Sequence, residues 1–115
     1  MLVEKNTPLQ DCNTFGIVAS ADTLVRIRSA ADVQEFAASS HYQGRQVFVL
    51  GGGSNIVLTG DVIHAVVLKM EIPGIAAVGD TDSYGIIEAG AGVRWPDLVA
   101  WTGAHGYPGS ANLAW

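Results

Sequence analysis

The sequence has few of the residues that mark disulfide scaffolds, metal sites or membrane spans. Its one cysteine, Cys12, cannot form an internal disulfide, and we expect it to be a small buried apolar residue. No apolar run is longer than Val47–Leu50, far short of the roughly 20 residues that span a membrane. The N-terminus lacks a basic segment followed by an apolar core, so no secretory signal is indicated. We therefore expect a cytoplasmic protein without a membrane partner.

Basic residues are also scarce. Six Lys and Arg stand against eleven Asp and Glu, which gives a formal net charge of −5. Arg26 and Arg28 are the only basic pair close in sequence, whereas nucleic-acid binders usually carry a basic patch or stripe. The three histidines, His41, His64 and His105, share no metal-ligand spacing. We therefore expect neither a nucleic-acid partner nor a metal site.

Glycine, in contrast, is abundant and clustered. The apolar run that ends at Leu50 leads directly into Gly51–Gly53, followed by Ser54 and Asn55. Because glycine has no Cβ, it can adopt positive φ and let another group approach the main chain. Consecutive N–H groups in such a turn can converge on an anion. We interpret the turn as a phosphate cradle for a nucleotide cofactor, and we expect Gly52→Val to abolish binding because a β-branched residue resists positive φ.

Known phosphate-binding motifs do not match this turn. No Gly-Lys-Ser/Thr follows the glycines, and the apolar, strand-like residues from Ile56 onward do not open a helix. Backbone N–H groups and the side chains of Ser54 and Asn55 would therefore bind the phosphate. The alternative is a tight, hairpin-like turn that uses glycine for its geometry alone. A second turn, Gly90–Gly92, is either a further contact to a diphosphate or a simple strand-to-helix turn.

The hydrophobic pattern predicts a mixture of strands and helices. Residues 1–18 are expected to form an extended, loop-rich stretch. We expect strands at 23–28, 46–50, 65–70, 74–78 and 84–89, and helices at about 30–40 and 95–102. This order indicates an α+β or mixed α/β protein. The first strand, helix and strand should form a right-handed unit if the two strands are parallel neighbours. No residue stands out as an acid, a base or a nucleophile.

Four short motifs, in order, resemble one enzyme family. They are Asn13–Ile17, Leu50–Asn55, Gly90–Trp95 and Gly106–Ala114, and together they cover essentially the whole chain. The set resembles the UDP-N-acetylenolpyruvoylglucosamine reductase (UDP-N-acetylmuramate dehydrogenase) family. The resemblance implies an α+β FAD-binding fold of the vanillyl-alcohol oxidase / p-cresol methylhydroxylase type, incomplete in this chain. Residues 1–70 would form the first FAD-binding subdomain, and residues 71–115 the truncated start of the second.

The resemblance also implies a chemistry. In this family non-covalently bound FAD is reduced by NADPH, and the flavin passes hydride to the double bond of UDP-N-acetylglucosamine enolpyruvate. The product is UDP-N-acetylmuramate, so the implied role is that of a cytoplasmic oxidoreductase in peptidoglycan synthesis, cell-wall biogenesis and cell division. The implied cofactor-binding residues are Leu50, Gly51, Gly52, Gly53, Ser54, Asn55, Ile56, Gly90, Ala91 and Gly92. The Asn13–Gly16 motif is expected to be mainly structural.

The sequence departs from the family near its end. Ser110 and Ala111 stand where the family usually has a leucine and an acidic residue, and the family's catalytic serine, arginine and glutamate lie beyond Trp115. No catalytic residue is therefore assigned, and the chain alone is expected to be inactive. Two alternatives remain: a stand-alone module that holds FAD or another diphosphate for a partner, or a truncated product that self-associates through its unfinished sheet.

Overall fold

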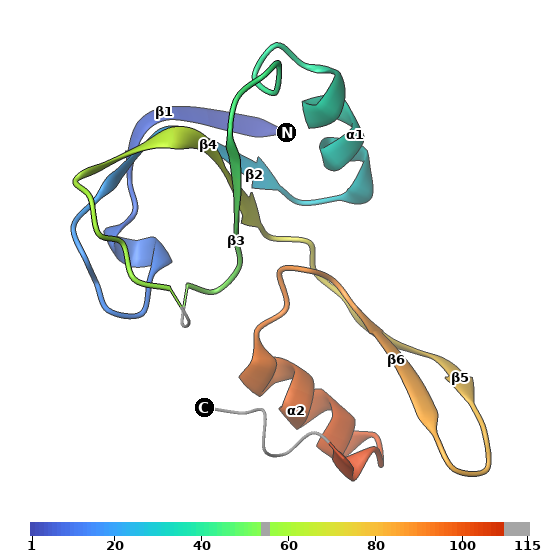
Figure 1. Cartoon of the computed structure of the whole chain (residues 1–115). Coiled ribbons are helices and arrows are strands. Elements are labelled where there is room, and N and C mark those ends of the chain that lie inside the picture. Colours follow the sequence, from blue (N-terminus) through green and yellow to red (C-terminus); the bar gives the residue numbers. More distant parts are fainter. Residues whose placement is uncertain (54–55, 110–115) are drawn as a thin grey trace. The chain divides into compact units, whose positions relative to one another are not determined.

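A computed structural model describes residues 1–53 and 56–109 of the chain (Figure 1). The chain divides into two compact units, Met1–Glu71 and Ile72–Trp115, called here the N-terminal unit and the C-terminal unit. The assignment of 1–70 and 71–115 to two FAD-binding subdomains stays a prediction.

The N-terminal unit is built on a four-stranded sheet. Its strands are β1 (Leu2–Pro8), β2 (Ser20–Ile27), β3 (Val47–Leu50) and β4 (Val62–Met70), in the order β1-β2-β4-β3 (Figure 1). β1 is antiparallel to β2, whereas β2 and β3 are both parallel to β4. The two central strands, β2 and β4, carry most of the buried residues. Their apolar runs suit strands that are covered on both faces.

Helix α1 (Ala30–Ala38) connects β2 to β3. It begins after Ser29, whose Oγ accepts a hydrogen bond of 3.2 Å from the Asp32 N–H. Asp32 Oδ2 accepts a bond of 2.9 Å from the N–H of Arg28, the residue before the cap, so both side chains of the Ser-x-x-Asp pattern stabilise the start of the helix. Phe36 is the buried residue of this helix. The predicted helix is confirmed, with an earlier end than expected.

The N-terminal stretch corrects the sequence analysis. β1 lies where an extended, loop-rich segment was expected, and it pairs with β2 from Leu2 opposite Arg26 to Pro8 opposite Ser20. Most of its side chains are exposed or half-exposed, as in an edge strand. Such a strand needs no regular apolar alternation, which is why the pattern did not reveal it. The short 3-10 helix Gln10–Cys12 follows.

The strand order gives a second correction. β2 and β3 flank the helix in sequence but are not neighbours, because β4 lies between them. β3 and β4 are parallel neighbours, so the segment that connects them is not a hairpin turn. A hairpin between β3 and β4 is therefore excluded, while a turn that uses glycine for its geometry alone stays an alternative.

The C-terminal unit consists of a hairpin and a helix (Figure 1). Strands β5 (Ile75–Asp80) and β6 (Gly85–Ala89) are antiparallel, and helix α2 (Trp95–Ala104) follows with a proline in its first turn. The three elements confirm the predicted ones to within a few residues. Among the described residues, no helix is long and apolar enough to cross a membrane.

One core cluster positions the glycine turn. It consists of Leu9, Ala21, Leu24, Leu50 and Val67, and four partly buried residues pack against it: Cys12, Ile56, Leu58 and Ile63. Leu50, the last residue of β3, is 2% exposed. The residues before and after the turn are therefore anchored in the same apolar cluster, which fixes where the turn begins and ends. Cys12 is partly buried rather than fully buried.

Candidate functional site

The glycine loop, defined here as Gly51–Gly53, is the described part of the predicted cradle. It follows β3 directly, at the carboxyl end of a strand that is parallel to its neighbour. Ligands of α/β sheets commonly bind beyond the carboxyl ends of parallel strands. The predicted site residues Ser54 and Asn55 lie outside the described residues.

Gly53 is the glycine that the loop requires. Its φ is +75°, in the left-handed region. A Cβ at this position would overlap the Cys12 carbonyl oxygen and lie 2.7 Å from Asn13 Cα. Gly52 has no positive φ, and a Cβ there would meet no atom within 4 Å. The stated reason for the Gly52→Val effect is therefore wrong, since both the backbone strain and the close approach belong to Gly53.

The Asn13–Ile17 motif lies directly beside the loop. The Thr14 N–H donates to the Gly53 carbonyl at 3.0 Å. Asn13 is buried, and its Nδ2 donates to the carbonyls of Leu9 (2.8 Å) and Ile17 (3.2 Å). Its Oδ1 accepts from the Ile17 N–H at 2.9 Å. Asn13 thus holds the backbone turn that supports the glycine loop, in agreement with the structural role expected for this motif.

Lys69, which the sequence analysis did not single out, also contacts the loop. This β4 residue pairs with Leu50 in the parallel register, and its Nζ donates to the Gly51 carbonyl at 2.5 Å. Protein donors therefore hold two of the three carbonyls of the loop. Within residues 1–53 and 56–109, the N–H groups of Gly52 and Gly53 donate to no acceptor. Occupied carbonyls and open N–H groups are the arrangement that an anion-binding loop needs.

The second glycine turn has the opposite arrangement. The Gly90 N–H donates to the Gly74 carbonyl at 2.8 Å, and the Gly92 N–H donates to the Ile72 carbonyl at 2.9 Å. A Cβ on Gly90 would overlap the Ile72 carbonyl oxygen. Glycine is needed here because two stretches of main chain pack closely. Cofactor contacts from Gly90, Ala91 and Gly92 stay a prediction, and the N–H groups of Gly90 and Gly92 are already in use.

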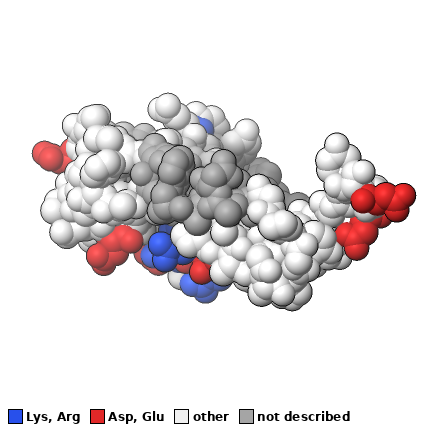
Figure 2. Space-filling model, turned by 90° about the horizontal axis from the view of Figure 1, so that it is seen from below, with Lys and Arg blue, Asp and Glu red and all other residues white. Residues whose placement is uncertain are grey.

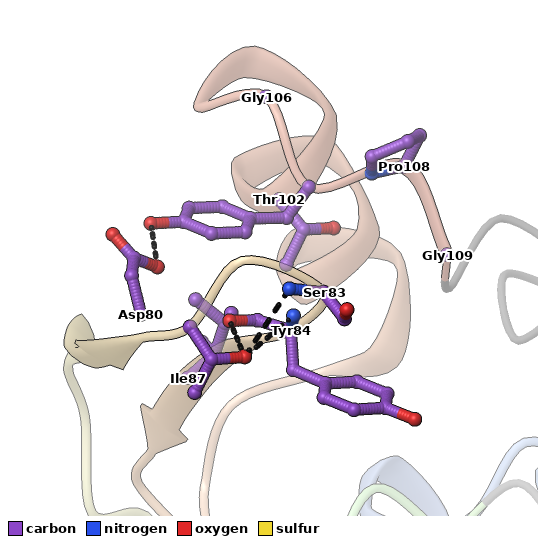
Figure 3. Close-up of a pocket in the computed structure, with 11 residues that line it drawn as sticks. Asp80, Ser83, Tyr84, Ile87, Thr102, Gly106, Pro108 and Gly109 are labelled. Carbon is purple, nitrogen blue, oxygen red and sulfur yellow. Dashed lines mark hydrogen bonds between the residues drawn. The ribbon is translucent and has the colours of Figure 1, made fainter.

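A cavity of about 500 Å³ lies within the C-terminal unit, between the β5–β6 turn and the segment after α2 (Figure 3). Asp80, Ser83, Tyr84 and Tyr107 are among the residues that line it. Tyr107 Oη donates to Asp80 Oδ1 at 3.1 Å, and this bond raises the pKa of the Tyr107 phenol. Its lining, as far as the described residues form it, contains a carboxylate and no Lys or Arg, and this charge does not favour a diphosphate.

The charged groups of the N-terminal unit form mainly structural pairs. Arg26 contacts Glu4 at 3.0 Å and Glu71 at 3.1 Å, and Arg28 lies 3.6 Å from Glu71. The hydrogen bond from Arg26 to Glu4 raises the pKa of the guanidinium further. Charged side chains are sparse on the face seen in Figure 2. No group of three or more His, Cys, Asp and Glu side chains in the described part of the chain could hold a metal ion.

Comparison with known proteins identifies the class. The sequence pattern of the FAD binding domain family matches residues 21–114, which is most of the chain. The chain therefore belongs to the FAD binding domain family, and FAD is its cofactor, as expected. The mixed sheet and the two helices are consistent with part of the α+β, vanillyl-alcohol oxidase / p-cresol methylhydroxylase type of FAD-binding fold.

The relatives give the particular resemblance. UDP-N-acetylenolpyruvoylglucosamine reductase from Azoarcus sp. (strain BH72) is 44% identical over 118 residues, which cover 99% of this chain and 34% of that protein. The reductase of Ralstonia nicotianae is 44% identical (98% and 34% covered), and that of Cupriavidus pinatubonensis is 47% identical (93% and 31% covered). The family resemblance is thus confirmed. The chain spans about a third of the length of these relatives.

Proposed function

We propose that this chain forms part of the FAD-binding portion of a UDP-N-acetylenolpyruvoylglucosamine reductase. The complete enzyme would be an NADPH-dependent oxidoreductase that converts UDP-N-acetylglucosamine enolpyruvate to UDP-N-acetylmuramate in cytoplasmic peptidoglycan synthesis. The names of the relatives and the four ordered motifs support this activity. The observation that carries the proposal is the glycine loop, in which the protein holds two of the three carbonyls and the N–H groups of Gly52 and Gly53 donate to no described residue.

The residues of the loop fit the diphosphate of FAD. A diphosphate needs several N–H donors and room to approach the main chain. Gly52 and Gly53 provide the N–H groups, and the exposed Gly52, where a Cβ would meet no atom within 4 Å, provides the room. The predicted binding segment is Leu50–Ile56, with Gly90–Gly92 as a second contact. Leu50 and Ile56 would act indirectly, because they pack in or against the core and fix the ends of the loop.

When bound, FAD supplies the hydride transfer to the enolpyruvyl double bond. The described residues would bind and orient the cofactor through its diphosphate. Protonation of the adjacent carbon needs a positioned acid. We propose that this acid belongs to the part of the reductases that the chain does not span, so that the chain binds flavin without turnover.

An absorption spectrum of the chain, taken after addition of FAD and desalting, tests the proposal. Retained flavin bands are expected, since the loop and its supports lie within one compact unit. A chain that releases all flavin while it keeps its fold by circular dichroism would contradict the proposal.

Two alternatives make different predictions. A stand-alone module would retain FAD as a monomer and bind a second protein that supplies the reaction. A self-associating product would elute as an oligomer, because β1 and β3 each pair on one side only within the described sheet. Size-exclusion chromatography of the FAD-loaded chain at high concentration distinguishes them. Neither nucleic acid nor a membrane is proposed as a partner.

A further inference from the structure

We propose that Lys69 is a positioning residue of the glycine loop and also supplies a cationic contact to the diphosphate that the loop binds. This inference rests on the proposed function. Its starting point is the hydrogen bond from Lys69 Nζ to the Gly51 carbonyl, which links β4 to the first residue of the loop. The motifs that led to the loop do not include Lys69.

Peptide geometry explains what this hydrogen bond achieves. The Gly51 carbonyl and the Gly52 N–H belong to the same peptide unit, and no cis peptide bond occurs among the described residues. In a trans peptide the C=O and the N–H point in opposite directions. A carbonyl that is held toward Lys69 therefore directs the Gly52 N–H away from the Lys69 ammonium, so that these two donors would contact different phosphates of one diphosphate. Since each glycine has wide conformational freedom, this bond selects one orientation of the peptide.

The place of Lys69 at the glycine loop distinguishes it from the other cations of the N-terminal unit. Arg26 and Arg28 pair with carboxylates, and Lys5 and Arg45 each donate to the Thr23 hydroxyl at 3.0 Å. Like Lys5 and Arg45, Lys69 forms no ion pair with any residue in 1–53 or 56–109, but of these three only Lys69 contacts the glycine loop. An ammonium group has three donors, and the Gly51 carbonyl occupies one of them. An unneutralised cation thus lies at the edge of the loop in a chain of net charge −5.

The sheet register makes the position of Lys69 specific. Lys69 is paired with Leu50 across the parallel β3–β4 ladder. Its side chain can therefore reach Gly51, the residue that follows Leu50. Lysine recognises phosphate as a flexible point charge and needs no planar, bidentate geometry. The ligand group that fits this set of donors is a diphosphate, and a flavin without phosphates would make no use of Lys69.

The test is a titration of the chain with FAD, ADP and riboflavin. Lys69→Met should weaken FAD and ADP binding about tenfold, as expected for loss of a charged hydrogen-bond donor, and leave riboflavin binding unchanged. Lys69→Arg should restore most of the affinity. The affinity of the wild-type chain for ADP should fall as salt is added, and that of Lys69→Met should fall less. Lys5→Met is the matched control, because it removes the same charge from β1.

Equal FAD and ADP affinities for Lys69→Met and the wild-type chain would overturn the cationic contact. The positioning role has its own measurement, the Gly52 amide signal in an NMR spectrum of the flavin-free chain. This signal should shift in Lys69→Met and stay in place in Lys5→Met; an unmoved signal would overturn the positioning role. If the wild-type chain binds no FAD while the Gly52 signal still shifts, the positioning role stands and the FAD proposal fails.

Discussion

The two glycine turns differ in which of their backbone groups already form hydrogen bonds within the protein. In the glycine loop, Lys69 and Thr14 hold carbonyls, and the N–H groups of Gly52 and Gly53 donate to no described residue. In the Gly90–Gly92 turn, the N–H groups of its two glycines donate to carbonyls before β5. Both turns need glycine because main chain packs against main chain. The comparison teaches that a glycine cluster can bind an anion through its main chain only where its N–H groups remain open.

The largest expected effect is that of Gly53→Ala. The new Cβ would overlap the Cys12 carbonyl, and alanine disfavours the left-handed φ of this residue. We expect the free energy of unfolding of the N-terminal unit to fall by about 3 kcal/mol, and flavin retention to be lost. Urea denaturation and the absorption spectrum measure the two effects.

The matched control is Gly52→Ala, at the neighbouring residue of the same loop. A Cβ there meets no atom within 4 Å, so stability should change by no more than about 0.5 kcal/mol. If the two variants were equally stable, Gly53 would not be the constrained glycine of the loop.

Asn13→Ala should have the next largest effect. It removes three hydrogen bonds and leaves the Leu9 carbonyl and both backbone groups of Ile17 without this partner. We expect a loss of about 2 kcal/mol in the free energy of unfolding, measured by urea denaturation. FAD affinity should fall as well, because the Asn13 turn supports Gly53.

Thr14→Ala is the control for Asn13→Ala. The Thr14 side chain is exposed, and its backbone N–H, which holds Gly53, is kept in the variant. Stability and FAD affinity close to those of the wild-type chain are expected. If Thr14→Ala lost as much stability as Asn13→Ala, the Thr14 hydroxyl would support the loop, and the role given to the Asn13 amide would be wrong.

Hydrogen exchange tests the difference between the two turns directly. In the flavin-free chain, the Gly90 and Gly92 amides donate to carbonyls, whereas the Gly52 and Gly53 amides donate to no described residue. The Gly90 and Gly92 amides should therefore exchange at least about ten times more slowly than the Gly52 and Gly53 amides. Addition of FAD should slow the Gly52 and Gly53 amides. Exchange at Gly52 and Gly53 that is already slow without FAD would show that their N–H groups are not open.

The sequence predicted the elements well where burial imposes a pattern. The central strands and both helices have apolar periodicity or caps that are local in sequence, as at Ser29 and Asp32. The hydrophobic pattern did not predict β1, because an edge strand leaves most of its side chains exposed. The insertion of β4 between β2 and β3 depends on pairing over long sequence separations, which no local pattern encodes.

The sequence proposes a binding segment, and that proposal stays a prediction, whereas the roles of single residues in the loop depend on tertiary structure. The glycines after β3 indicated an anion loop, but the need for positive φ at Gly53 arises from packing against Cys12 and Asn13, which are distant in sequence. The contact of Lys69 depends on the parallel register between β3 and β4. The constraint on Gly53 and the contact of Lys69 both depend on tertiary structure. Neither can be read from the sequence before the positions of the neighbouring residues are known.

The acid sensitivity of the N-terminal unit gives a smaller effect. The hydrogen bond from the Arg28 N–H, and next the one from the N-terminal amino group, lower the pKa of the Asp32 carboxyl. A lowered pKa in the folded state means that the contribution to stability is present above the unfolded pKa, about 3.9, and is lost as the pH falls through the folded value. Asp32→Asn should flatten the acid limb of a stability–pH curve. Asp11→Asn, at an exposed carboxyl, should leave the acid limb unchanged.

The C-terminal unit should respond at the opposite end of the pH range. The bond from Tyr107 Oη to Asp80 raises the pKa of the phenol, because ionisation would remove the donated proton and place two negative charges together. The protonated phenol therefore contributes stability below its unfolded pKa, about 10, and the contribution is lost as the pH rises through the folded value. Tyr107→Phe should remove this alkaline limb, whereas Tyr84→Phe, at an exposed ring, should preserve it. If the alkaline loss of stability persisted in Tyr107→Phe, it would arise from the ionisation of another group. The Tyr107–Asp80 bond would then have no measurable effect on stability.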